Sequence, residues 1–145
     1  RVEPERQSYL QEIETLINWM EMYPEVDVVV THGLNWRMFV QGGAIVLPPS
    51  IWEVFKNPRA YLQFLFPIGL GSIWEYPMTE VKSVIEECVT KIGADRLMWG
   101  TDMPIVMRSW TYQQNVSFMN NSCDFLSGDQ RDMIMGGTIG RLLKI

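Results

Sequence analysis

Residues 96–104 read RLMWGTDMP, and this stretch decides which fold the rest of the chain must support. The apolar run Leu97–Trp99 predicts a short strand, which Gly100–Asp102 ends with a carboxylate. In a (β/α)8 barrel the strand interiors are packed core, whereas residues at the carboxyl ends of the strands line the active site. Asp102 is therefore a candidate catalytic residue. The alternative is that its side chain caps the turn before Pro104, because aspartate is common in turns.

A second strand with a polar residue at its end lies earlier in the chain. Residues 26–31, VDVVVT, form a nearly unbroken apolar run of β-branched residues, which predicts a strand buried on both faces of a parallel sheet. His32 and Gly33 follow directly, and His32 is the single histidine of the sequence. A lone histidine is often a hydrogen-bonded structural residue, but this position is one that a barrel uses for catalysis.

Helices and strands alternate along the rest of the predicted chain. This order predicts right-handed βαβ units on a parallel sheet, an α/β fold. Gly93 is expected as a left-handed cap, and the last helix is expected to break or to pack closely against a neighbour at Gly136, Gly137 and Gly140. The predicted helices cover 4–22, 35–41, 50–55, 78–92, 111–125 and a last segment opened by Ser127-Gly128-Asp129, and the predicted strands cover 26–31, 60–68 and 97–100.

Three strands cannot close a barrel, and a three-stranded parallel sheet would leave long apolar edges exposed. Either these units form an open three-layer sandwich, or residues before Arg1 complete a larger barrel. The apolar strands, with His32 and Asp102 at their ends, favour the barrel. A start at Arg1 within a helical pattern also predicts that residues 1–145 are one partial domain of a longer protein.

The composition of the chain limits the classes of partner that the protein is expected to bind. The chain has 145 residues, 47% of them hydrophobic, and a net charge of −5 without a cluster of Lys and Arg, which argues against nucleic acid as a partner. The apolar runs are too short for a membrane span. Cys88 and Cys123 lie far apart without metal-type spacing, which favours a reducing, cytoplasmic location.

Three segments in order resemble the C-terminal half of an amidohydrolase-related metal-dependent hydrolase, in the branch that includes decarboxylases and lactonases. They are YPEVDVVVTHG (23–33), GADRLMWGTDMP (93–104) and FLSGDQRDMIMGGTIGRLLKI (125–145). The resemblance spans nearly the whole chain and implies strand–helix units six to eight of a (β/α)8 barrel. In the tail, Gly137, Arg141 and Leu142 match the family pattern, whereas Thr138 stands where asparagine is usual and Gly140 where alanine is usual.

The resemblance also implies roles for two side chains. Asp102 would bind a divalent metal ion, expected to be zinc, and accept a proton from the water that the metal activates. His32 would polarise a carbonyl or carboxylate of a small-molecule substrate. The other family ligands, a His-x-His pair on strand one and a histidine on strand five, would have to lie before Arg1, so these 145 residues alone are expected to be inactive.

Three further residues are weaker candidates for substrate binding. The guanidinium of Arg108 could pair with a substrate carboxylate, although a surface salt bridge is the simpler expectation. Trp36 and Trp110 could wall a substrate pocket, and core packing under the loops is at least as good an explanation for both.

Three functional hypotheses follow. The first is a metal-dependent hydrolase or non-oxidative decarboxylase acting on a small carboxylated or acyl substrate. The second is a related lactonase without a tightly held metal, in which Asp102 still activates water. The third is a non-catalytic half-barrel with a structural or partner-binding role, in which His32 and Asp102 only cap their strands. The Trp and Met content would also fit a homodimer.

Overall fold

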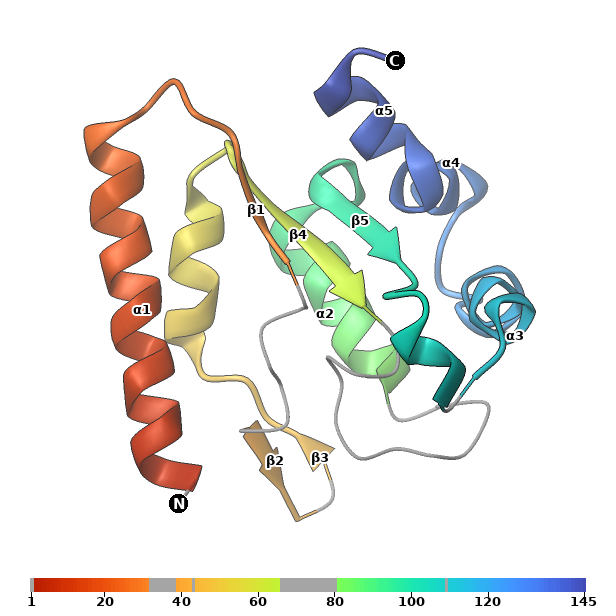
Figure 1. Cartoon of the computed structure of the whole chain (residues 1–145), viewed down its shortest axis with the longest axis horizontal. Coiled ribbons are helices and arrows are strands. Elements are labelled where there is room, and N and C mark those ends of the chain that lie inside the picture. Colours follow the sequence, from red (N-terminus) through yellow and green to blue (C-terminus); the bar gives the residue numbers. More distant parts are fainter. Residues whose placement is uncertain (1, 32–38, 43, 66–80, 109) are drawn as a thin grey trace.

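The computed structural model describes residues 2–31, 39–42, 44–65, 81–108 and 110–145. Its main sheet has three strands in the order β1 (Val28–Val30), β4 (Ala60–Leu65) and β5 (Leu97–Gly100), and both pairings are parallel (Figure 1). The predicted parallel α/β fold is therefore confirmed. None of the helices in these ranges is long and apolar enough to cross a membrane.

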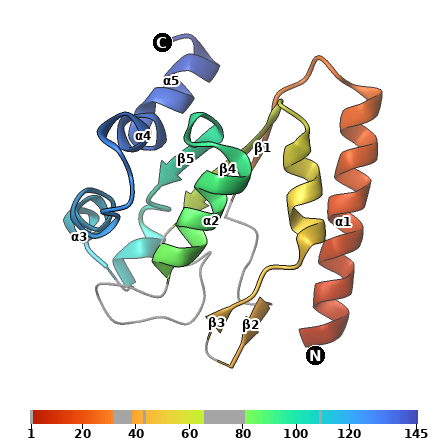
Figure 2. The same ribbon diagram turned by 180° about the vertical axis from the view of Figure 1, so that it is seen from behind.

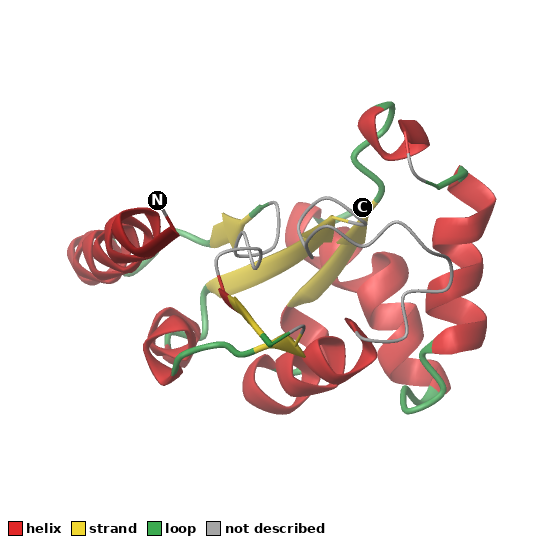
Figure 3. Ribbon diagram, turned by 90° about the horizontal axis from the view of Figure 1, so that it is seen from below, coloured by secondary structure: helices red, strands yellow, loops and turns green. Residues whose placement is uncertain are grey.

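The helices lie outside the strands. Helix α1 (Val2–Met22) and the 3-10 helix η2 (Pro49–Lys56) flank the β1 side, and α2 (Lys82–Ile92) crosses behind the sheet in Figure 1 and in front of it in Figure 2. The C-terminal helices lie on the β5 side. Seen from below, helices lie on both sides of the strands and beneath them (Figure 3).

The two faces of the sheet differ in their packing. The register pairs Leu62 with Leu97 and Phe64 with Trp99, and these side chains join the hydrophobic core under the helices. The next residue of each pair, Gln63 opposite Met98, points to the other face because side chains alternate along a strand. Met98 is buried but lies outside that core cluster. One face of the sheet therefore packs against the helices, and the other face carries Gln63 and Met98.

Strand β1 is shorter and more exposed than the sequence predicted. It covers Val28–Val30 instead of 26–31, and all three residues are only partly buried. Among the described strands β1 pairs only with β4. The predicted burial on both faces is not present within the described residues.

A β-hairpin replaces the end of the predicted helix 35–41. Val40–Gln41 forms β2, which pairs antiparallel with β3 (Ala44–Ile45), so a helix through residue 41 was a wrong prediction. Gly42 lies in the connecting turn with φ 58°, a conformation that glycine adopts at little cost. Residues 35–38 are outside the described part of the chain.

The two predicted helices that flank β4 are present, with altered geometry or ends. The 50–55 segment is η2, in which Pro49 occupies the start, where a missing N–H costs nothing. α2 ends at Ile92 as predicted, and 78–80 lie outside the described residues. Gly93 has the expected positive φ, 93°, but its ψ of 139° is not left-handed helical. Strand β4 is described up to Leu65, and residues 66–68 of the prediction are not among the described positions.

Capping boxes open both C-terminal helical segments. The hydroxyl of Thr111 accepts a hydrogen bond from Gln114 N at the start of α3 (Tyr112–Ser117), and Ser127 does the same with Gln130 N for α4 (Gly128–Asp132). Each helix continues into a π-helical segment: η7 (Phe118–Ser122) ends the first three residues earlier than predicted, and η8 (Met133–Gly137) leads into α5 (Thr138–Leu143).

The last helix is not broken at its glycines. It changes there to the π-helical segment η8, which contains Gly136 and Gly137 and runs directly into α5. A Cβ added at Gly137 would lie 2.8 Å from Met133 Sδ and 3.3 Å from Asp132 O, so this glycine packs closely against the preceding turn of the same helical segment.

One arginine joins the two strand–helix units. Arg96 ends the 3-10 turn η5 (Ala94–Arg96), directly before β5, and its guanidinium donates to four backbone carbonyls. Nε and Nη2 bond Ile92 O at 3.1 and 2.7 Å, and Nη1 bonds carbonyls at the end of η2 and the start of β4: Phe55 O at 2.9 Å, Asn57 O at 2.9 Å and Ala60 O at 3.4 Å.

We expect Arg96→Lys to lower the free energy of unfolding by about 2 kcal/mol, because one ammonium cannot satisfy carbonyls on three elements at once. Arg59→Lys is the matched control, since Arg59 makes an exposed ion pair with Asp27 and its replacement should cost less than about 1 kcal/mol. Urea unfolding followed by tryptophan fluorescence measures both variants. Equal losses would contradict the structural role of Arg96.

Candidate functional site

The carboxyl ends of β4 and β5 meet closely beside Asp102. Gly100, opposite Leu65 in the register, closes β5. A Cβ added at Gly100 would lie 2.6 Å from Leu65 Cδ2 and 3.0 Å from Gln63 Nε2. A larger residue at this position would require the side chains of Leu65 and Gln63 to move away from the strand end. The first described strand, β1, runs parallel to both, so its carboxyl end, just before His32, faces the same way.

The backbone of Asp102 adopts a conformation that few residues tolerate. Its φ is 53°, in the left-handed region, where aspartate is several-fold enriched over most side chains. The turn that follows is held by other atoms: Val106 N donates to Asp102 O at 3.2 Å, and Met103 N donates to Thr101 Oγ1 at 3.4 Å. The Met103-Pro104 peptide bond is cis.

The carboxylate of Asp102 is partly buried and faces no partner among the residues that the structure describes. No hydrogen bond or ion pair to it is formed within those ranges, so the described contacts give no support to the alternative in which the side chain caps the turn. A half-buried carboxylate held at a strand end without a partner is a suitable ligand for a divalent cation.

The other predicted site residues are placed less completely. Trp110 is 2% exposed, and its ring packs against Phe118 with centroids 5.6 Å apart. Arg108 ends the 3-10 turn η6 (Ile105–Arg108), and the position of its side chain is not described. His32 and Trp36 lie outside the described residues. The structure therefore does not test whether these residues gather around Asp102.

Several residues near Asp102 were not predicted from the sequence. Met103, Met107 and Tyr112 expose about half of their surface after β5, and the ring of Tyr112 meets Trp99 edge to face at 6.1 Å. The indole Nε1 of Trp99 is buried and has no hydrogen-bond partner within the described part of the chain. Gln63 is a polar side chain in an otherwise apolar strand, and that interruption is the signal in the sequence that could have found it.

Neither cysteine suits a thiolate ligand. Burial raises the pKa of Cys123 to about 11 and holds the pKa of Cys88 well above its ordinary value. Both thiols are therefore protonated at neutral pH. Within the described ranges, no group of three or more His, Cys, Asp or Glu side chains could hold a metal ion. Asp102 can thus supply one ligand, and a complete centre requires others.

Several known structures share the fold of this chain. An amidohydrolase from Burkholderia multivorans with bound zinc superimposes with a TM-score of 0.78 at 14% identity, covering 94% of this chain and 50% of its own. A second structure of an amidohydrolase from Burkholderia multivorans, with bound HEPES, superimposes with a TM-score of 0.76 at 14% identity and the same coverage. A dihydroxybenzoic acid decarboxylase from a Polaromonas species, with bound manganese and the inhibitor 2-nitroresorcinol, superimposes with a TM-score of 0.58 at 18% identity. The match covers 94% of this chain and 38% of the decarboxylase chain.

The chain thus spans about half the length of the first structures that it matches. At these identities the likeness establishes the fold. No curated protein matches the chain significantly. The family model described as amidohydrolase matches residues 8–145, nearly the whole chain. This chain belongs to the amidohydrolase family.

Proposed function

We propose that residues 1–145 form strand–helix units six to eight of a (β/α)8 barrel and contribute one end of the active site of a metal-dependent amidohydrolase. The reaction is hydrolysis or non-oxidative decarboxylation of a small carboxylated or acyl substrate. The observation that carries the proposal is the Asp102 carboxylate, which a left-handed turn holds at the end of β5 without a partner among the described residues. Family membership supports the same assignment.

Asp102 has two tasks in this proposal. Its carboxylate is a metal ligand, and it accepts a proton from the attacking water or transfers one to the substrate. The bound metal supplies Lewis acidity and lowers the pKa of water. Zinc is the proposed ion, and the zinc and manganese of the neighbouring structures support a divalent metal more generally. Histidine ligands from strands one and five, as the family resemblance implies, complete the centre.

His32 is proposed to polarise the substrate without binding the metal. It directly follows the Val28–Thr31 segment, whose carboxyl end faces the same way as the end of β5. An imidazole there would donate a hydrogen bond to a developing oxyanion. Arg108 is proposed to pair with a substrate carboxylate, and Trp36 and Trp110 to form walls of the pocket. Because Trp110 is buried against Phe118, its contribution would be to support the pocket from beneath.

Decarboxylation, one of the two proposed reactions, has the support of a structural neighbour that is a decarboxylase. The two reactions differ in their products: hydrolysis consumes water and yields an acid, whereas decarboxylation releases carbon dioxide. Screening carboxylated aromatic substrates against acyl and lactone substrates, with detection of carbon dioxide, separates the two reactions.

Asp102→Asn in the complete enzyme should lower kcat by about 10² to 10⁴-fold, because the amide cannot accept the proton. Its free energy of unfolding should change little, since asparagine also tolerates a left-handed backbone. Asp129→Asn, an exposed acid in the first turn of α4, is the matched control and should retain full turnover. Unchanged turnover in Asp102→Asn would refute the assignment.

His32→Ala should reduce kcat by about 10² to 10³-fold while the protein retains its metal, because the imidazole is proposed to act on the substrate and not as a ligand. Metal content measured by plasma mass spectrometry, beside steady-state kinetics, gives both quantities. Loss of the metal together with activity would show that His32 is itself a ligand.

A further inference from the structure

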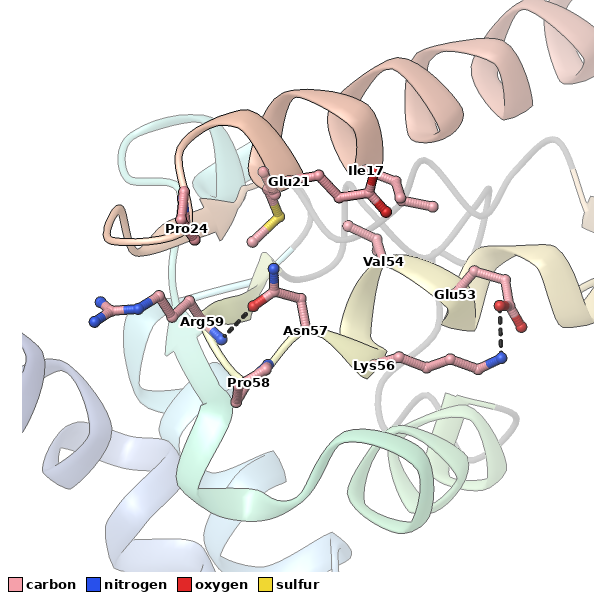
Figure 4. Close-up of a pocket in the computed structure, with 10 residues that line it drawn as sticks. Ile17, Glu21, Pro24, Glu53, Val54, Lys56, Asn57, Pro58 and Arg59 are labelled. Atoms are coloured by element: carbon pink, nitrogen blue, oxygen red, sulfur yellow. Dashed lines mark hydrogen bonds and ion pairs between the residues drawn. The ribbon is translucent and has the colours of Figure 1, made fainter.

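A cleft lies at the opposite end of the sheet from Asp102. It is a cleft of about 580 Å³ between the C-terminal part of α1, the end of η2 and the residues that lead into β4 (Figure 4). Asp102 follows the carboxyl end of β5, whereas this cleft opens beside the amino end of the parallel strand β4. Its volume is within the range of small-molecule sites. A ligand bound here would not touch the candidate catalytic end.

The cleft has apolar walls. The accessible apolar lining comes from Ile17 of α1 and from Pro24 and Pro58 of the adjoining turns, whereas Met20 and Val54 are buried in the core beneath it. A neighbouring hollow of about 330 Å³ shares Ile17 and Glu53 and continues toward Leu10 and Ile13. The space therefore suits a ligand with an aromatic or aliphatic body, and burial of that body is the main source of affinity.

Charge pairing leaves one carboxylate for the ligand. Four charged side chains line the cleft, and two of them pair with each other: Lys56 Nζ lies 2.6 Å from Glu53 Oε2. A third, Arg59, pairs with Asp27 at 3.0 Å, and its guanidinium extends away from the cleft in Figure 4. Glu21 has no ion-pair or hydrogen-bond partner within the described ranges, and its side chain runs toward Ile17 and Val54. The local charge is therefore negative.

The end of α1 adds to this negative charge. The helix has 21 residues, and no basic residue occupies its last turn. The last carbonyls of a helix carry a partial negative charge that favours a cation nearby. Asn57 supplies the remaining polarity: its Oδ1 accepts a hydrogen bond from Arg59 N at 3.0 Å, so its amide nitrogen is directed to the cleft side (Figure 4).

We propose that this cleft binds an organic cation, a primary ammonium on an aromatic or alkyl body. The ammonium pairs with Glu21 and the last carbonyls of α1, and the body packs against Ile17, Pro24 and Pro58. Asn57 donates to an acceptor elsewhere on the ligand. The site is distinct from the proposed catalytic one and does not depend on bound metal or on turnover.

The test compares three probes of one shape: benzylamine, benzyl alcohol and benzoate. Each is titrated into the 15N-labelled protein at neutral pH, and amide shifts are followed for Glu21 and Asn57 in the cleft and for Thr101 at the far end of the sheet. Benzylamine should bind at least five-fold more tightly than benzyl alcohol, and benzoate more weakly than both. The shifts should be confined to the cleft, and the advantage of benzylamine should shrink in 0.5 M salt.

Glu21→Gln should remove the advantage of benzylamine and leave the affinity for benzyl alcohol unchanged. The matched control is Glu12→Gln, an exposed residue of the same helix outside the cleft, which should preserve the advantage. Equal binding of the alcohol and the amine, tighter binding of benzoate, equal effects of the two variants, or no shifts in the cleft would each overturn the proposal. None of these readouts requires catalysis, so they stand or fall separately from the proposed function.

Discussion

The fold depends most on the guanidinium of Arg96. Its three nitrogens bond carbonyls of Phe55, Asn57, Ala60 and Ile92, which lie on three different elements. A planar, permanently charged group with several fixed donors can satisfy such a set, whereas a shorter or single-point donor cannot. Because Arg96 directly precedes β5, the same contacts set where β5 begins beside β4. The Leu62–Leu97 register then brings the carboxyl ends of both strands together at Asp102.

The C-terminal helix extends this network. The hydroxyl of Thr138 donates to Ala94 O at 3.2 Å, and the guanidinium of Arg141 donates to Asp95 O, so two side chains of α5 hold the turn that carries Arg96. Thr138 is also fully buried. Thr138 stands where the family usually has asparagine, and its hydroxyl makes a tertiary contact here. The segments around Ala60, Arg96 and Thr138 are thereby tied together although they lie far apart in sequence.

The sequence predicted those helices and strands that are determined by the pattern of neighbouring residues. The helical spacing of apolar residues in 4–22 and the run Leu97–Trp99 each produced the expected element. The hairpin at Gly42 was missed because two-residue strands have no periodicity to read. The burial of β1 was overestimated because an apolar run does not show which segments cover the two faces of the strand. Both features depend on how segments far apart in the sequence come together in the fold.

The candidate site also combines features that the sequence could predict with features that it could not. The position of Asp102 at a strand end could be predicted, because an apolar run followed by Gly-Thr-Asp is a local pattern. Its left-handed backbone could not, because it depends on how the turn to Val106 is bonded. The close approach of Gln63 and Leu65 to Gly100 also depends on strand pairing. The cleft at the other end could not be predicted, since Glu21 and Asn57 meet only through the packing of α1 on η2.

The positive φ of Asp102 also constrains how this lineage can evolve. Every aspartate codon becomes an asparagine codon through one first-base change, and asparagine accepts the same backbone conformation. A descendant could therefore lose the carboxylate by a single nucleotide substitution and keep the turn. Glycine is also one base away and accepts this backbone, whereas valine and alanine, likewise one base away, would meet the steric cost of a left-handed backbone. Decayed relatives of this chain should accordingly carry GTNMP or GTGMP where it carries GTDMP, with the surrounding fold preserved.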